Sequence, residues 1–191
     1  MTFTLFTDYK ALTDEQLMER VRLHTSEKAF EEIYHRYARL LQGFFFRRLG
    51  GNEEQALDLT QDTFLRMWGA REQYALNVNV RTWVFTIAYN LCKNIYRQNM
   101  HEQEYLDSLP AEEPLAEDNT PIILDAATFD KALQQELLGM SEQQQMLFEL
   151  RFTQELTVPE IARILSIPQG TVKSRLHTLT EYLRKKLKNY E

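Results

Sequence analysis

Helix-capping signals recur near both ends of the chain, and each is followed by apolar residues spaced three and four positions apart. A capping box, which is a Ser or Thr with Glu or Gln three residues later, begins at each of Thr13, Ser141 and Thr157. No stretch alternates between polar and apolar residues in the way that a half-buried strand does. The sequence therefore predicts an all-α protein.

Two helical regions flank a segment of different composition. Residues 99–136 hold ten acidic residues, one basic residue and three of the five prolines, without a sustained helical period. This composition is typical of a flexible linker, although a spacer that only keeps the protein in solution has it too. We therefore expect two small helical domains joined by an acidic linker. Residues 1–98 form the first, with four helices, and residues 137–191 form the second, which ends in a helix-turn-helix.

The composition argues against several classes of protein. Cys92 is the single cysteine, so the chain forms no internal disulfide, which suits a reducing cytoplasm. No stretch approaches the roughly 20 apolar residues that cross a bilayer, so we expect no direct membrane insertion. The histidines lack metal-ligand spacing, and no glycine loop suits phosphate binding. We expect no catalytic residue, no metal, no cofactor and no enzymatic activity.

The helix that Asn52 caps carries a polar face with one leucine in it. On the side opposite its apolar stripe lie Asp58, Gln61, Asp62 and Leu65. An apolar anchor within a polar rim is typical of a protein contact. The plainer interpretation is a solvated helix face with an ordinary exposed leucine, and the pattern alone leaves both open.

The helix expected from about Val80 to Gln98 combines aromatic rings with cations and has no carboxylate after Arg81. Its predicted buried face holds Val84, Ile87, Ala88, Leu91 and Ile95. Its other face holds Thr82, Phe85, Thr86, Tyr89, Lys93, Tyr96 and Arg97. Such a face suits single-stranded nucleic acid, because bases stack on rings while phosphates meet cations. A partner interface or ordinary aromatic packing gives the same pattern.

Two features at the start of this helix favour contact with opened DNA. Trp83 lies at the margin of the buried stripe, where its ring can act as a wedge at the junction at which a duplex opens. The preceding loop, residues 73–79, is rich in amides. Asn77 and Asn79 in that loop are placed to read the edge of an extruded base.

The last two predicted helices have the spacing of a helix-turn-helix. The second of them leaves six polar residues outside its apolar stripe: Thr171, Lys173, Ser174, Arg175, His177 and Thr178. Side chains near the start of such a helix enter a major groove, and the basic residues at its end hold phosphates. Helical hairpins that do not bind DNA share the pattern.

Three segments resemble the sigma-70 family of RNA polymerase sigma factors, extracytoplasmic-function (ECF) type. They are Asp58–Arg66 (DLTQDTFLR), Arg81–Leu91 (RTWVFTIAYNL) and Glu160–Leu176 (EIARILSIPQGTVKSRL). The resemblance covers nearly the whole chain, and three motifs in the family's order make a chance match improbable. It implies an alternative sigma factor that directs promoter recognition, DNA melting and transcription initiation.

The resemblance also assigns a role to each surface. It implies that core RNA polymerase is bound by Asp58, Gln61, Asp62, Leu65 and Arg66. The loop 73–79 and the helix 81–97 match the region that melts and reads the minus-ten element, and the helix from Gly170 matches the reader of the duplex minus-thirty-five element. The acidic segment matches the linker that runs through the RNA exit path. The implied partners are core polymerase, promoter DNA in duplex and single-stranded form, and an anti-sigma factor.

Two other functions remain open from the residues alone. A stand-alone helix-turn-helix regulator would use its first domain for sensing or dimerisation, and it would bind its operator tightly without polymerase. A helical adaptor would bind only proteins.

Overall fold

The computed structural model describes residues 7–107 and 128–188, with side chains described outside residues 98–107 and Thr128. Every regular element within these ranges is helical, so the all-α prediction is confirmed. The chain divides into two compact units, Met1–Arg97 and Gln98–Glu191. Each unit has its own buried apolar residues, and each is described here by itself.

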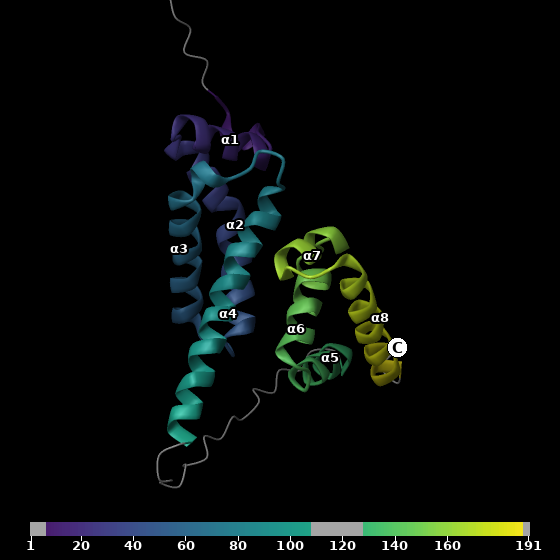
Figure 1. Ribbon diagram of the computed structural model, residues 1–191. Helices are drawn as coiled ribbons and strands as arrows, with labels where there is room; N and C mark the ends of the chain where they lie inside the picture. Colours follow the sequence, from purple (N-terminus) through teal and green to yellow (C-terminus); the bar gives the residue numbers. More distant parts are fainter. Residues whose placement is uncertain (1–6, 108–127, 189–191) are drawn as a thin grey trace, which may run out of the picture. The chain divides into compact units, whose positions relative to one another are not determined.

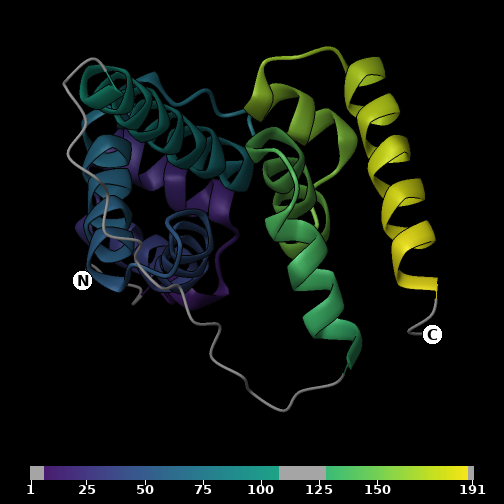
Figure 2. The ribbon, with the colours of Figure 1, turned by 90° about the horizontal axis from the view of Figure 1, so that it is seen from below.

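The first unit is built around one long central helix. Its elements are η1 (Tyr9–Ala11), α1 (Asp14–His24), α2 (Glu27–Arg48), α3 (Glu53–Gly69), η2 (Arg71–Gln73) and the beginning of α4 (Val80–Asp107). The central helix α2 packs against α1 and α3, and α4 runs alongside it (Figure 1). Figure 2, turned by 90°, shows α3 and α4 on neighbouring sides of α2. Fully buried side chains fill the interior, including Leu17, Val21, Ile33, Leu41, Phe44, Phe45, Met67, Val84, Phe85 and Ala88.

The helix ends follow the predicted capping residues. The Thr13 hydroxyl accepts the backbone N–H of Gln16 at the start of α1, and the reciprocal bond completes the capping box. The Asn52 side-chain oxygen accepts the backbone N–H of Gln55 and so caps α3. The helix α2 ends before Gly50 and Gly51, which have φ angles of 62° and 87°. Glycine adopts this left-handed backbone without strain, so the pair forms the sharp turn into α3.

A partly buried polar cluster fixes α1 on α2. The Arg36 guanidinium donates to the Leu12 carbonyl at 2.9 Å and to the Asp14 carboxylate at 2.7 Å. The Tyr37 hydroxyl donates to the other oxygen of the same carboxylate. Burial, followed by the bond to Asp14, raises the pKa of Tyr37, and the bond to Asp14 raises the pKa of Arg36. Both groups therefore stay protonated at neutral pH, as the cluster requires.

The second unit packs three shorter helices against its last one. Its elements after the end of α4 are α5 (Thr128–Leu138), α6 (Glu142–Phe148), the π-helical turn η3 (Glu149–Thr153), α7 (Val158–Leu165) and α8 (Gln169–Leu187). The helices α5, α6 and α7 all contact α8. The capping boxes at Ser141 and Thr157 are both present, as predicted. Most of the predicted stripe of α8 is buried (Val172, Leu179, Leu183 and Leu187), and Leu176 is half-buried.

The expectation that residues 99–136 lack helical structure is wrong at both ends. The helix α4 continues to Asp107, because no proline or glycine interrupts the chain between Val80 and that residue. The helix α5 begins at Thr128, and Ala132 is buried in the second unit. Phe129, Ala132 and Leu133 do have helical spacing, but the acidic composition around them obscures it. The remaining residues of the expected linker, 108–127, lie outside the described part of the chain.

Candidate polymerase and nucleic-acid interfaces

The polar face predicted on α3 is exposed as expected. The opposite side of the helix is buried through Ala56, Thr60, Thr63, Phe64 and Met67. Leu65 is 71% exposed, and Asp58 and Gln61 are exposed beside it. Asp62 is half-buried and accepts a hydrogen bond from the Arg66 Nε at 3.1 Å, four residues later. The face is therefore an apolar anchor within a charged rim, which is the composition of a protein interface.

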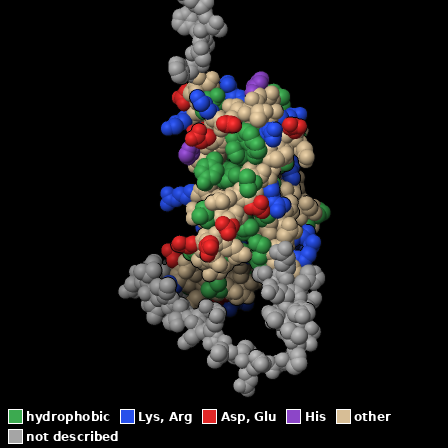
Figure 3. Space-filling view, turned by 90° about the vertical axis from the view of Figure 1, so that its left-hand side faces the viewer, with side chains coloured by type: hydrophobic (Ala, Val, Ile, Leu, Met, Phe, Trp, Pro, Cys, Tyr) green, Lys and Arg blue, Asp and Glu red, His purple; other side chains and the backbone are tan. Residues whose placement is uncertain are grey.

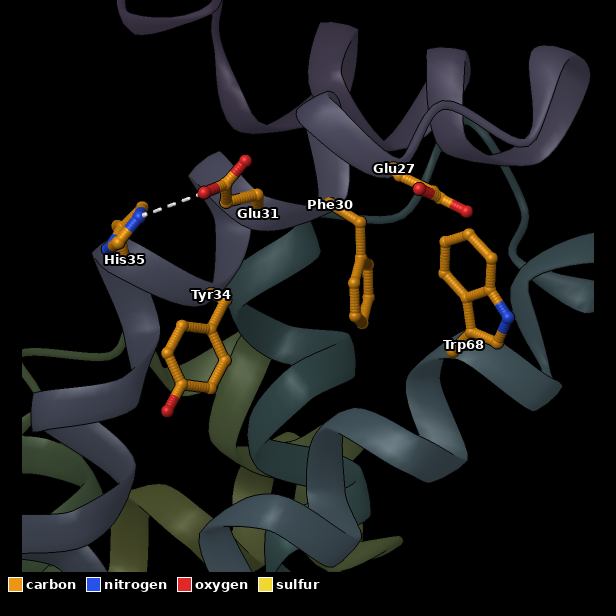
Figure 4. Close-up of a pocket in the computed structure, with 6 residues that line it drawn as sticks. All are labelled: Glu27, Phe30, Glu31, Tyr34, His35 and Trp68. Atoms are coloured by element: carbon orange, nitrogen blue, oxygen red, sulfur yellow. Dashed lines mark ion pairs between the residues drawn. The ribbon is translucent and has the colours of Figure 1, made fainter.

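An aromatic groove lies between α2 and α3, on the side of the first unit that carries α3. It has a volume of about 450 Å³ and is lined by Glu27, Phe30, Glu31, Tyr34, His35 and Trp68 (Figure 4). Phe30 packs edge-to-face on Trp68 with ring centroids 5.0 Å apart. Tyr34 is 39% exposed although helical spacing places it on the apolar side of α2. Helical periodicity alone predicts burial for Tyr34, so the groove was not found from the sequence.

The groove and the exposed face of α3 belong to one surface. Trp68 follows Leu65 by three residues, so both side chains lie on the same side of α3. The space-filling view shows a contiguous apolar patch on this side of the unit, bordered by acidic and basic side chains (Figure 3). A large apolar patch with a polar border is typical of a binding surface.

The prediction of which α4 residues are exposed is wrong for two residues. Thr82 and Phe85 are fully buried, and the Phe85 ring packs edge-to-face on Phe44 with centroids 5.5 Å apart. The buried stripe is Val80, Thr82, Val84, Phe85, Ala88, Leu91 and Cys92. It is rotated relative to the prediction, which leaves Ile87 and Ile95 half-buried. The prediction assigned aliphatic residues to the core-facing side of α4. The structure also places Phe85 on that side, because its ring packs against the Phe44 ring of α2.

The other residues predicted for this face remain accessible. Lys93 and Arg97 are exposed, and the half-buried residues are Arg81, Trp83, Thr86, Tyr89 and Tyr96. The Tyr96 hydroxyl donates to the carbonyl of Arg48 at 3.0 Å, so this ring is partly committed to packing against α2. The face thus keeps rings and three cations without a carboxylate, which suits a single strand.

The amide loop before α4 is held by side-chain hydrogen bonds and a contact between two rings. The Tyr74 hydroxyl donates to the Val78 carbonyl, and the Tyr74 ring lies 5.0 Å from that of Trp83. The Asn79 side-chain oxygen accepts the backbone N–H of Thr82 at 3.1 Å and so caps α4. Asn77 is exposed. Asn79 is exposed as well, so the two predicted base-reading asparagines differ in hydrogen bonding and not in exposure.

The helix-turn-helix formed by α7 and α8 is present as predicted. Ile161 and Ala162 of α7 are buried, and so is Ile164, which sequence reasoning did not single out. The helix α7 ends at Ser166, whose φ of 54° is left-handed, and the N–H of Ile167 returns to the Ala162 carbonyl at 3.0 Å. This turn directs the chain into α8.

The predicted contact residues of α8 lie on its accessible side. Thr171 is half-buried, and Lys173, Ser174, Arg175, His177 and Thr178 are exposed. At the end of the helix, Arg184 pairs with Glu181 at 2.5 Å and Lys186 lies 3.9 Å from the Glu136 carboxylate. These pairs neutralise part of the basic end. Lys185 and Lys188 are also exposed there, so both the start and the end of α8 keep cations that a duplex can meet.

The second unit also has an apolar groove that the sequence did not predict. It has a volume of about 270 Å³ and is lined by Phe129, Leu133, Phe148, Phe152, Thr180, Leu183, Arg184 and Leu187. Phe129 and Phe152 are 38% and 46% exposed. Apolar rings exposed along a groove suit the apolar face of a partner helix.

The part of the chain that the structure describes contains neither a metal-binding cluster nor a candidate membrane span. No group of three or more His, Cys, Asp or Glu side chains there is placed to hold a metal ion. Among the same residues, no helix is both long enough and apolar enough to cross a membrane.

Comparisons with known proteins identify both units. Residues 33–102 match the family model of sigma-70 region 2, and residues 130–178 match that of sigma-70 region 4. The RNA polymerase sigma factor YlaC of Bacillus subtilis is 31% identical over 162 residues, which cover 83% of this chain and 92% of YlaC. The ECF RNA polymerase sigma factor SigW of the same organism is 30% identical, with 85% and 91% covered.

A solved structure agrees with these sequence relatives. It is the sigma factor RpoE of Bartonella quintana in complex with the anti-sigma factor NepR, and RpoE is 25% identical to this chain. The structural match has a TM-score of 0.64 and covers 84% of this chain and 98% of RpoE. The first unit matches region 2, so a stand-alone regulator with a sensing domain is not favoured. The chain belongs to the ECF group of the sigma-70 family and is an alternative sigma factor that acts in transcription initiation.

Proposed function

We propose that this chain binds core RNA polymerase through the first unit and reads a promoter with both units, as single-stranded DNA on α4 and as duplex on α8. The supporting observation is that one chain matches both region 2 and region 4 and bears cations on an accessible side of a helix in each. Its site of action would then be the cytoplasm, where bacterial polymerase transcribes. It acts by binding, without covalent chemistry of its own.

The proposed core-binding surface consists of Asp58, Gln61, Asp62, Leu65 and Arg66. Leu65 supports this assignment because a leucine that is 71% exposed gains a large apolar contact only when a partner covers it. The aromatic groove adjoins the same side of α3, and Glu27 and Glu31 border it. A polymerase segment that carries both apolar and basic side chains therefore fits this surface.

The proposed minus-ten surface combines the amide loop with the accessible side of α4. It consists of Asn77, Asn79, Arg81, Trp83, Thr86, Tyr89, Lys93, Tyr96 and Arg97. Thr82 and Phe85 are removed from it, because both are buried in the unit. Stacking on one ring contributes roughly 1 to 3 kcal/mol per base, which offsets a few kcal/mol of unstacking when the duplex opens.

The proposed minus-thirty-five surface lies on the first turns of α8. It consists of Thr171, Lys173, Ser174, Arg175, His177 and Thr178. The Ser174 and Thr178 hydroxyls donate to carbonyls of their own helix, at 3.1 Å in each case, so they meet DNA as acceptors. Lys173 and Arg175 then provide the cationic donors to guanine edges or phosphates.

The proposed domain boundaries follow the two units. Residues 1–98 are the polymerase and minus-ten module, and residues 137–191 are the minus-thirty-five module. We assign α5 to the second module as well, because it contacts α8. Two small surfaces joined by a linker bind a promoter weakly until polymerase fixes their separation.

An anti-sigma factor is the proposed regulator. The relative RpoE of Bartonella quintana was solved with an anti-sigma factor bound. In this chain the two apolar grooves and Leu65 offer surfaces that such a partner can cover. Coverage of Leu65 would prevent the proposed contact with polymerase.

The test compares promoter binding by the full chain with and without core polymerase. The proposal predicts weak binding of the chain alone and a large gain in affinity when polymerase is added. Leu65→Ala should lower affinity for core polymerase, whereas Leu138→Ala, at an 80% exposed leucine of the second unit, is the matched control. Tight and polymerase-independent binding to one duplex would contradict the proposal and favour a stand-alone regulator.

A further inference from the structure

Several hydrogen bonds hold the loop between η2 and α4, and three of them concern the turn and its asparagines. The Tyr74 hydroxyl donates to the Val78 carbonyl, and the Val78 N–H donates to the Ala75 carbonyl at 2.9 Å. The second bond closes a β-turn over residues 75–78. The third is the cap of α4, in which the Asn79 side chain accepts the Thr82 N–H at 3.1 Å. The loop is therefore shaped before any ligand binds.

Tyr74 is the fixed point of this loop. Its side chain is 1% exposed, and its ring lies 5.0 Å from the ring of Trp83 at an angle of 51°. Burial, with a smaller contribution from the negative charge of Glu15, raises the pKa of Tyr74 to about 12. The hydroxyl is therefore protonated at neutral pH and remains a donor to Val78. A single side chain thus contacts both the loop and the proposed wedge residue.

The two asparagines of the loop differ in what they can offer a base. Asn77 occupies the third position of the turn and is exposed, and Leu76 beside it is 43% exposed. Recognition of a base edge by asparagine uses the side-chain oxygen and the NH₂ group together. The Asn79 oxygen accepts the N–H of Thr82, so this amide is oriented by the start of α4 and would have to share its oxygen with a base. Asn77 is the loop asparagine suited to a bidentate contact.

We propose that Tyr74 is a positioning residue for promoter recognition, and that its hydroxyl holds the turn so that Asn77, and not Asn79, reads an unpaired base. This inference deepens the proposed function and rests on it, because the loop meets an unpaired base only if the first unit binds opened DNA. A loop already held in its binding shape loses little conformational freedom when a base docks. Removal of one buried hydroxyl should therefore lower the preference for the correct base about three- to tenfold.

The experiment measures base preference directly. The full-length chain and core polymerase select open complexes from a promoter library that is randomised over the melted element, and sequencing gives the preference at each position. The variants are Tyr74→Phe, Asn77→Ala and Asn79→Ser, the last of which keeps a capping oxygen without an amide. Tyr37→Phe is the matched control, because it also removes a buried hydroxyl donor from the first unit but lies outside the loop.

The expected pattern separates positioning from general stability. Asn77→Ala should abolish the preference at one position, and Tyr74→Phe should reduce it about three- to tenfold at that same position. Tyr37→Phe should leave it unchanged, Asn79→Ser should lower it less than Tyr74→Phe does, and all four variants should keep the wild-type affinity for core polymerase. Preference unchanged by Tyr74→Phe, lowered equally by Tyr37→Phe, or abolished by Asn79→Ser would overturn the inference. If the wild-type chain enriches no promoter, the proposed function itself fails.

Discussion

Replacing Phe85 and Tyr89 separately with alanine distinguishes the packing face of α4 from the face proposed to bind DNA. The two residues lie four positions apart, yet Phe85 is fully buried whereas Tyr89 is half-buried. Phe85 also packs edge-to-face on Phe44 at 5.5 Å. The structure therefore predicts that Phe85→Ala lowers stability and that Tyr89→Ala lowers promoter opening.

The expected magnitudes differ enough to be separated. A buried phenylalanine removes at least ~150 Å² from water, which at ~25 cal/mol per Å² is about 4 kcal/mol. Measured Phe→Ala changes in protein cores cost about 3 to 5 kcal/mol, which agrees with this figure. A domain of this size is stable by about 5 to 15 kcal/mol, so Phe85→Ala should remove a large fraction of the stability of the first unit. Tyr89→Ala should change stability by less than about 1 kcal/mol and weaken opening by the roughly 1 to 3 kcal/mol of one stacked base.

The assay uses the tryptophans of the chain. Trp68 and Trp83 are its only two and both belong to the first unit, so their fluorescence in urea reports the unfolding of that unit alone. Promoter opening is followed in parallel with a fluorescent base analogue in the non-template strand. A Phe85→Ala chain with a near wild-type urea midpoint and defective opening would refute the reasoning, because Phe85 would then face DNA.

Three further predictions concern the polar face of α3, the turn at Ser166 and the thiol of Cys92. The double variant Asp62→Ala, Leu65→Ala should compete for core polymerase at least tenfold more weakly than the wild-type chain and should keep the same urea midpoint. Unchanged competition would show that this face of α3 does not bind polymerase. Ser166→Gly should stabilise the second unit by about 1 kcal/mol in thermal unfolding, because glycine relieves the left-handed φ of 54°, and a loss of stability would contradict this. Burial raises the pKa of Cys92 from 9 to about 12, so the folded thiol should resist aromatic disulfide reagents at pH 9. The free energy of unfolding should also fall as pH rises from 9 towards 12, because the unfolded thiol ionises first; a pH-independent free energy would contradict this.

Local signals in the sequence predicted most of the fold. The capping boxes at Thr13, Ser141 and Thr157 depend on residues three positions apart, so they can be recognised without knowing what packs where. The exposed face around Leu65 was predicted for the same reason, because one helical period determines it. The spacing of the helix-turn-helix was also predicted from such local signals.

Features that depend on distant partners could not be predicted in the same way. Phe85 is buried because Phe44, 41 residues earlier, lies opposite it, and helical periodicity does not reveal such a neighbour. The aromatic groove forms because α2 and α3 leave room beside Tyr34 and Trp68. The difference proposed between Asn77 and Asn79 depends on the particular hydrogen bonds of one loop. The helical start of the second unit was missed because acidic residues obscured the spacing of α5.

The central claim is that this chain directs core RNA polymerase to start transcription by melting promoter DNA on α4. The most direct measurement is single-round run-off transcription with purified core polymerase and a promoter selected by the full-length chain. The account predicts a transcript with a defined start that requires the chain. Tyr89→Ala should strongly reduce this transcript, and a template already unpaired across the melted element should recover it. Equal RNA synthesis with and without the chain would contradict the account.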